Sequence, residues 1–215
     1  MQNNGDGSLT HTFAMLPALF LIPLVALLRI FLAWLPAGTF SGGGLPGACP
    51  LSAVALCAGL FLPRRLALVV PLGALLVSDL AIFAHYGYWG EFPGTAVPRY
   101  ALLAGLGLGG LVLRRMHGGR GPLTTLLATF AGSTLFYVAT NTLEWLKFPQ
   151  YPAGVAGWWQ ALTTGLPGYV PTYVFYRNGL VSDLLYSMVF VACIRLSVRP
   201  QSTVGSDVVL AAARR

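Results

Sequence analysis

Residues 66–86 read LALVVPLGALLVSDLAIFAHY, an almost wholly apolar stretch that carries a single carboxylate, Asp79. A helix of this length covers the ~30 Å hydrocarbon core of a bilayer. An ionisable side chain at that depth costs about 3 kcal/mol or more unless it is paired or faces water. The stretch therefore predicts a membrane-spanning helix, and Asp79 is a candidate functional residue on it.

The composition of the whole chain also indicates a membrane protein. Its 215 residues are 56% hydrophobic and 9% charged, whereas soluble domains carry about 25% charged residues. The net charge of +7 comes from short basic clusters between apolar runs, which mark the cytoplasmic side of a membrane protein. We therefore expect contact with membrane lipids and no nucleic acid. The three cysteines form no CxxC pair, so neither a disulfide framework nor a zinc site is predicted.

Apolar runs divide the chain into an all-α, polytopic bundle of six membrane-spanning helices. We expect these helices at residues 13–35, 50–62, 66–86, 100–113, 123–146 and 179–198. The run at 50–62 is shorter than the ~20 residues that a crossing needs. The six-helix membrane domain then occupies residues 13–198, between an N-terminal tail at 1–12 and a C-terminal tail at 199–215.

Basic residues give the bundle an orientation. If six helices alternate in direction, one side of the membrane receives nine arginines: Arg64, Arg65, Arg114, Arg115, Arg120, Arg195, Arg199, Arg214 and Arg215. The other side receives only Arg99, Lys147 and Arg177. The positive-inside rule makes the arginine-rich side cytoplasmic, so we expect a multi-pass protein with both termini in the cytoplasm.

Two long loops on the predicted outer side, residues 85–99 and 147–178, are rich in Trp, Tyr, Pro and Gly. Aromatic residues of this kind form the interfacial belt of most membrane proteins. Long structured loops are also often functional, so these two could instead form a lid over an outward-facing pocket. Both interpretations stay open at the level of the sequence.

The same orientation gathers the polar side chains of the spans near the outer face. Arg29, Asp79 and Asp183 lie in the outer halves of their helices, and Asn141 shares a helix face with Glu144. Glu144 is close enough to the interface to be solvated. Asn141 can bind polar ligand groups without bringing a charge into the membrane. The layer predicts a binding site rather than a proton path, which would need polar groups through the inner half as well.

Eight residues of this layer and its loops are the expected ligand contacts: Arg29, Asp79, Asn141, Trp145, Tyr173, Arg177, Asn178 and Asp183. Trp89 is a further aromatic residue that could cover the ligand. A structural role is the alternative for the charged members, because an arginine paired with an aspartate can simply hold helices together.

One pentapeptide, LVSDL, occurs twice, at residues 76–80 and 180–184. The two copies fall in spans that run in opposite directions, and each places an aspartate in the outer half. Inverted repeats build many transporters. Five residues in a chain rich in Leu and Val do not establish a duplication.

Small residues form two further patterns. Ala14 and Ala18 lie at i, i+4 in the first span, and Gly105 and Gly109 lie likewise in the fourth. Faces of this kind let helices approach closely. They serve either packing inside the bundle or the docking of another membrane subunit.

Common enzyme motifs are absent from the sequence. The sequence has no GxSxG, HExxH or P-loop motif. We therefore expect no catalytic residue, no cofactor and no metal, and any ATP-driven transport would depend on partner ATPases.

The order and spacing of several of these residues resemble the sequence motifs of a family of small, largely uncharacterised bacterial membrane proteins. That family is similar to the substrate-binding (S) components of energy-coupling-factor (ECF) vitamin transporters of the riboflavin type. The resemblance covers about residues 45–198. It is carried by Pro50-x-x-Ala53-x-Ala55-Leu56-x-x-Gly59, Arg64-Arg65, Pro71, Ser78-Asp79-Leu80, Thr140-Asn141-x-x-x-Trp145, Tyr151-Pro152, Gly157 and the stretch from Arg177-Asn178 to Asp183.

The resemblance implies an S-component-like fold in the bacterial inner membrane, with a pocket for a small vitamin-like molecule near the outer face. It also implies an ECF transmembrane subunit and ATPases as partners, with Ala14 and Ala18 at the docking face. Gly47-Ala48-Cys49 replaces the aromatic-Asn-Phe-Ser/Thr segment that usually precedes the family's proline. The competing hypothesis is an accessory subunit that packs against a larger membrane complex. A pocket of a few hundred Å³ would favour capture, and a filled interior the accessory role.

Overall fold

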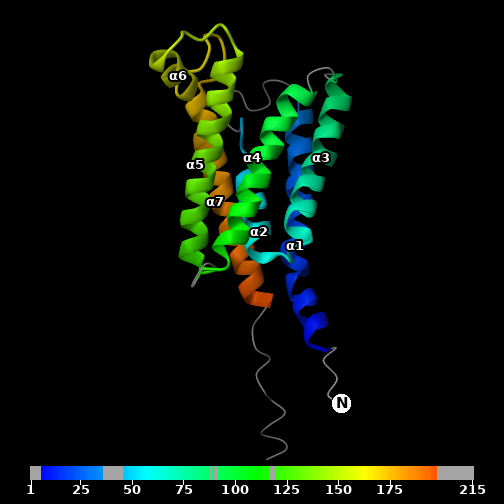
Figure 1. The fold of residues 1–215 in the computed structure, drawn as a ribbon. Helices are drawn as coiled ribbons and strands as arrows, with labels where there is room; N and C mark the ends of the chain where they lie inside the picture. Colours follow the sequence, from blue (N-terminus) through cyan, green and yellow to red (C-terminus); the bar gives the residue numbers. More distant parts are fainter. Residues whose placement is uncertain (1–5, 36–45, 88, 90–91, 117–119, 198–215) are drawn as a thin grey trace, which may run out of the picture.

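The structure, a computed structural model, describes residues 6–35, 46–87, 89, 92–116 and 120–197, without the side chains of 6–18 and 92–95. Across these ranges the chain is all-helical. The helices are α1 (Asp6–Trp34), α2 (Leu51–Phe61), α3 (Leu66–Tyr86), α4 (Phe92–Leu113), α5 (Pro122–Lys147), α6 (Val155–Leu162) and α7 (Thr172–Ser197). They form an elongated bundle with the short α6 at one end (Figure 1). We call this the α6 end, and α1 begins at the opposite end.

The described residues contain four helices that are long and apolar enough to cross a membrane, namely α3, α4 from Ala96, α5 and α7. Among the described residues, four such spans are present and not the expected six. Two shorter apolar helices accompany them: α2 and the Leu19–Trp34 part of α1. The 11 residues of α2 cover only about 16 Å at 1.5 Å per residue, roughly half of the hydrocarbon core.

Helix boundaries also differ from the expected loops. Helix α4 begins at Phe92 and contains Pro98, so much of the expected loop 85–99 is helical. The expected loop 147–178 contains all of α6 and the start of α7. Proline and charged residues predict helix ends, but here the helices continue through them. Helix α1 likewise begins at Asp6, inside the expected N-terminal tail.

The short helix α2 lies in the centre of the bundle and packs against α3, α4, α5 and α7. Ten of its 11 residues are buried. Its small residues allow this: a Cβ atom on Gly59 would lie 2.1 Å from the Gly107 carbonyl oxygen, and one on Gly110 would lie 2.5 Å from that of Leu56. Only glycine permits such a close approach of backbones. Helix α2 is thus a core helix rather than a crossing.

Opposite charges lie at the two ends of α2. At its start, the Ala53 N–H donates to the Asp183 carboxylate, with 2.9 Å between N and Oδ1. At its end, Arg114 donates to the Leu62 carbonyl at 2.8 Å and Arg120 to the Leu60 carbonyl at 3.1 Å. A negative group at the N-terminus and positive groups at the C-terminus both stabilise the helix dipole. These contacts satisfy helix ends that would otherwise lie unpaired inside the protein.

Candidate functional site

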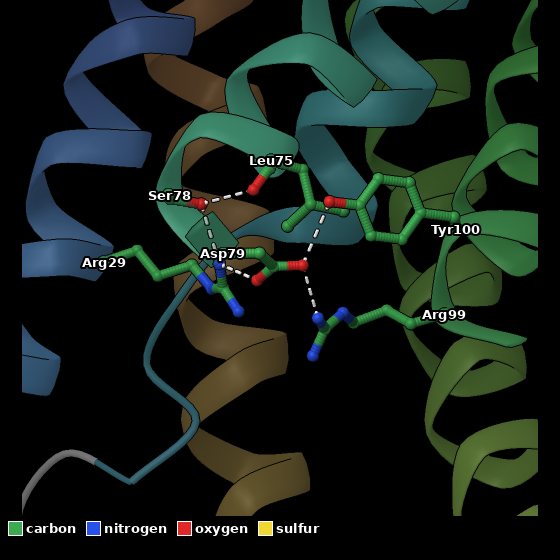
Figure 2. A network of polar contacts seen from close by, with 6 residues as sticks. All are labelled: Arg29, Leu75, Ser78, Asp79, Arg99 and Tyr100. Carbon is green, nitrogen blue, oxygen red and sulfur yellow. Dashed lines mark hydrogen bonds and ion pairs between the residues drawn. The ribbon is translucent and has the colours of Figure 1, made fainter. Parts of the chain in front are cut away.

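The buried carboxylate of Asp79 on α3 joins three helices (Figure 2). Its Oδ1 forms an ion pair with Arg29 Nη1 of α1. Its Oδ2 lies 2.5 Å from Arg99 Nη2 of α4 and accepts a hydrogen bond of 3.0 Å from the Tyr100 hydroxyl. The Asp79 side chain is fully buried, whereas those of Arg29 and Arg99 are 16% and 23% exposed. Two cations therefore share one carboxylate.

Ser78, the neighbour of Asp79, completes this network. Its hydroxyl accepts a hydrogen bond of 2.7 Å from Arg29 Nη1 and donates one of 2.8 Å to the Leu75 carbonyl. The ion pairs and the phenol hydrogen bond of Asp79 offset much of the cost of burying its charge, whereas Arg99 Nε has no hydrogen-bond partner among the described residues. The cluster holds the arginine of α1 against α3.

The second buried carboxylate, Asp183 on α7, has different partners. It accepts the Ala53 N–H of α2 and hydrogen bonds from the hydroxyls of Ser52 and Ser133. Its residue is 2% exposed. A carboxylate can be held without a cation when donors surround it and a helix N-terminus points at it. Asp183 therefore anchors the start of α2.

A cavity of about 660 Å³ lies beside Asp183. It is lined by residues of α1, α3, α5, α7 and the segment at 46–52. One wall is aromatic: α5 contributes Phe136 and Tyr137, and α7 contributes Phe175 and Tyr176. The rings of Tyr137 and Tyr176 pack against each other with centroids 4.7 Å apart. An apolar wall with a few polar groups at defined places is typical of small-molecule sites.

Three of the eight expected ligand contacts, Arg29, Asn141 and Asp183, line this cavity. The Asn141 amide donates from Nδ2 to the Tyr137 carbonyl at 2.9 Å. Asp79 does not line the cavity, but it holds Arg29 at the cavity wall. These residues come from helices far apart in the sequence, and the structure brings them to one place.

The other expected contacts are not among the residues that line the cavity. Arg177 Nε donates to Asn178 Oδ1 at 3.2 Å, and Asn178 Nδ2 donates to the Pro46 carbonyl at 3.1 Å. Asn178 thus supports the segment that lines the cavity. Trp145 donates to the Pro152 carbonyl at 3.1 Å. Tyr173 is 52% exposed.

The structure describes Trp89, which was expected to cover the ligand, and one of the two expected docking faces. Trp89 is half exposed. The side chains of Ala14 and Ala18 lie outside the described residues. Gly105 and Gly109 face away from the bundle, because a Cβ atom on either would meet nothing within 4 Å. The glycine run therefore has a packing face toward α2, described above, and a second, open face.

Sequence reasoning missed several lining residues. Phe136 and Tyr137 lie one turn before Thr140 and Asn141 on α5, and this i, i+4 spacing could have identified a common face. The backbone segment around Cys49 carries no polar pattern that would place it at the cavity wall. Among the described residues, no group of three or more His, Cys, Asp or Glu side chains could hold a metal ion.

Long apolar helices around a buried polar cluster define the chain as a helical membrane protein. It belongs to a family of unknown function, DUF6580, whose profile matches residues 9–204. No curated protein and no solved structure matches the chain.

Proposed function

We propose that this protein is a membrane-embedded substrate-binding protein that captures a small, vitamin-like molecule in the cavity between α1, α5 and α7. The observation that carries the proposal is the cavity itself, which has a volume of about 660 Å³. Ligand pockets measure about 300–1,000 Å³ and combine apolar walls with few polar groups. Arg29, Asn141 and Asp183 would supply those polar groups. A bundle without ligand-binding function would fill this space with side chains.

The helix directions support a membrane orientation. Helices α1 to α5 and α7 alternate in direction along the bundle (Figure 1), so α1 and α2 complete a six-helix arrangement in which α2 reaches only partway. Arg64, Arg114 and Arg120 then lie at the end opposite to α6. The positive-inside rule makes that end cytoplasmic. The cavity would face the outside of the bacterial inner membrane, as capture of an external molecule requires.

Uptake would need further subunits. We propose that the protein acts as the S component of an ECF-type transporter, or as a solitary relative of one. In the first case, a transmembrane subunit and ATPases would supply the energy. The residues that carry the resemblance include Asn141 and Asp183, and both line the cavity.

One observation favours a second function, that of an accessory subunit in a larger membrane complex. Gly105 and Gly109 on α4 leave an open strip on the surface of the bundle. Strips of small residues allow a partner helix to approach closely. Such a subunit would carry no transport of its own, and its cavity would bind no small molecule.

The experiment that separates these functions uses two tryptophan variants of α5. Thr140 lines the cavity, and within the described part of the chain its hydroxyl donates only to carbonyls of its own helix. The change Thr140→Trp therefore fills the cavity without breaking a contact between helices. Leu143→Trp is the matched control, since Leu143 is 39% exposed on the same helix.

Each purified protein would be denatured, and the released small molecules would be measured by mass spectrometry. We expect one molecule to be recovered with the wild-type protein and with Leu143→Trp, and to be lost with Thr140→Trp. Equal recovery from all three proteins, or recovery from none together with co-purification of a membrane subunit, would favour the accessory role.

A further inference from the structure

The cavity presents a positive charge to whatever it binds. Arg29 and Arg99 both pair with Asp79, so one carboxylate opposes two guanidinium groups. Of these two arginines, only Arg29 lines the cavity. Buried charge that is not fully balanced attracts a counter-ion strongly, because the surroundings screen it poorly.

The carboxylate of Asp183, which also lines the cavity, is less accessible to a ligand than the guanidinium group of Arg29. Asp183 is 2% exposed, against 16% for the Arg29 side chain. The Asp183 carboxylate already accepts hydrogen bonds from the start of α2 and from two serine hydroxyls. The helix N-terminus offsets its negative charge further. A ligand therefore meets the cation of Arg29 more readily than the anion of Asp183.

The aromatic wall and this cation line the same cavity. Arg29 is on α1, whereas Phe136, Tyr137, Phe175 and Tyr176 are on α5 and α7. Flat aromatic side chains bind a planar ring by stacking or edge contacts. A guanidinium group binds a carboxylate or phosphate through two parallel hydrogen bonds.

We propose that the captured molecule is an aromatic or heteroaromatic acid. Its ring lies on the aromatic wall, and its carboxylate or phosphate pairs with Arg29. This inference rests on the proposed function and adds the chemical class of the substrate.

Matched pairs of probes test the class directly. Nicotinate and nicotinamide share one ring, which carries an anionic carboxylate in the first and a neutral carboxamide in the second. Riboflavin 5′-phosphate and riboflavin differ by a phosphate. Binding of each to the purified full-length protein would be measured by calorimetry. We expect the anionic member of at least one pair to bind about tenfold tighter or more than its neutral partner. The pair that shows the preference distinguishes a carboxylate from a phosphate.

Two arginine variants separate a binding role from a structural one. Arg29→Gln and Arg99→Gln each remove one partner of Asp79, so both should lower the unfolding temperature. Only Arg29→Gln should abolish the preference for the anionic probe, because Arg99 is not among the residues that line the cavity. If both variants lose the preference equally, the arginines act through Asp79 alone and the inference fails.

The remaining outcomes distinguish this inference from the proposed function. If the neutral probes bind as tightly as the anionic ones, or if the molecule recovered by mass spectrometry is neutral or cationic, the substrate class is wrong and capture stands. An acid recovered from the protein supports the inference even when no probe binds. If no probe binds and no molecule is recovered, the proposed function fails and the inference with it.

Discussion

Asp79 and Asp183 occupy the same place in two copies of the pentapeptide LVSDL, and both are buried. Their partners differ in kind. Asp79 is held by two guanidinium groups and a phenol. Asp183 is held by a backbone N–H at the start of a helix and by two serine hydroxyls. The same local sequence thus supports an ion cluster in one helix and a helix-capping carboxylate in another.

The helices that pack against each aspartate, and not the pentapeptide, therefore determine which contacts the buried carboxylate makes. Asp79 faces α1 and α4, each of which brings an arginine. Asp183 faces α2, which begins inside the bundle after Pro50 and has no side-chain cap of its own. A carboxylate is the strongest acceptor available for such a helix start. Only the second arrangement leaves a carboxylate at the cavity wall.

The largest expected effect comes from breaking the ion cluster. Asp79→Ala leaves Arg29 and Arg99 without the carboxylate that both contact. Removal of one partner from a buried ion cluster costs about 3–5 kcal/mol of unfolding free energy. We expect low yield and a strongly lowered unfolding temperature in detergent, measured by intrinsic tryptophan fluorescence.

A triple variant controls for the loss of volume at this position. Asp79→Leu with Arg29→Met and Arg99→Met replaces the whole cluster by apolar groups of similar size. Such replacements are often neutral or stabilising, so this variant should recover most of the lost stability. A variant Asp79→Ala that unfolds at the wild-type temperature would show that the cluster does not hold α1, α3 and α4 together.

The helix-capping carboxylate should be less sensitive. Asp183→Ala removes the acceptor of the Ala53 N–H, a buried bond of 2.9 Å. An unsatisfied buried donor costs about 1–3 kcal/mol. Asp183→Asn keeps an oxygen that can accept this bond, so its cost should be about 1 kcal/mol or less. Denaturant titration of the purified variants gives both values.

Substitution by asparagine tests whether the two aspartates need a negative charge or only an oxygen that accepts a hydrogen bond. Asp79→Asn retains the size of the side chain but leaves two cations facing a neutral amide. Its effect should resemble that of Asp79→Ala, whereas Asp183→Asn should approach the wild type. Equal effects of asparagine at the two positions would contradict the distinction between an ion cluster and a helix cap.

Part of this site could be predicted from the sequence. The loop arginines oriented the helices, and this orientation placed Arg29, Asn141 and Asp183 at one depth. The structure brings these three to one cavity. The need of a buried charge for a partner also predicted that Arg29 pairs with one of the three carboxylates of the spans, and the structure shows that the partner is Asp79. Depth and charge are properties that a sequence reveals directly.

The remainder depends on packing between distant segments. The run at 50–62 was expected to cross the membrane, because a buried core helix and a membrane span have the same apolar composition. Only tertiary contacts show that α2 is enclosed by other helices. Arg99 was expected in the loop at 85–99, yet α4 begins at Phe92. The second cation of the Asp79 cluster was therefore missed.

Removal of a tyrosine hydroxyl near either carboxylate should change the unfolding free energy least. The Tyr100 hydroxyl donates to Asp79 at 3.0 Å, whereas the buried Tyr186 hydroxyl, one turn after Asp183, has no hydrogen-bond partner among the described residues. Tyr100→Phe should cost about 1 kcal/mol. Tyr186→Phe removes an unsatisfied polar atom, so it should leave the unfolding free energy unchanged or raise it by about 1 kcal/mol. Opposite signs in a denaturant titration would fit the two environments. If instead Tyr186→Phe destabilises as much as Tyr100→Phe, the surroundings of Asp183 must be more polar than this packing allows.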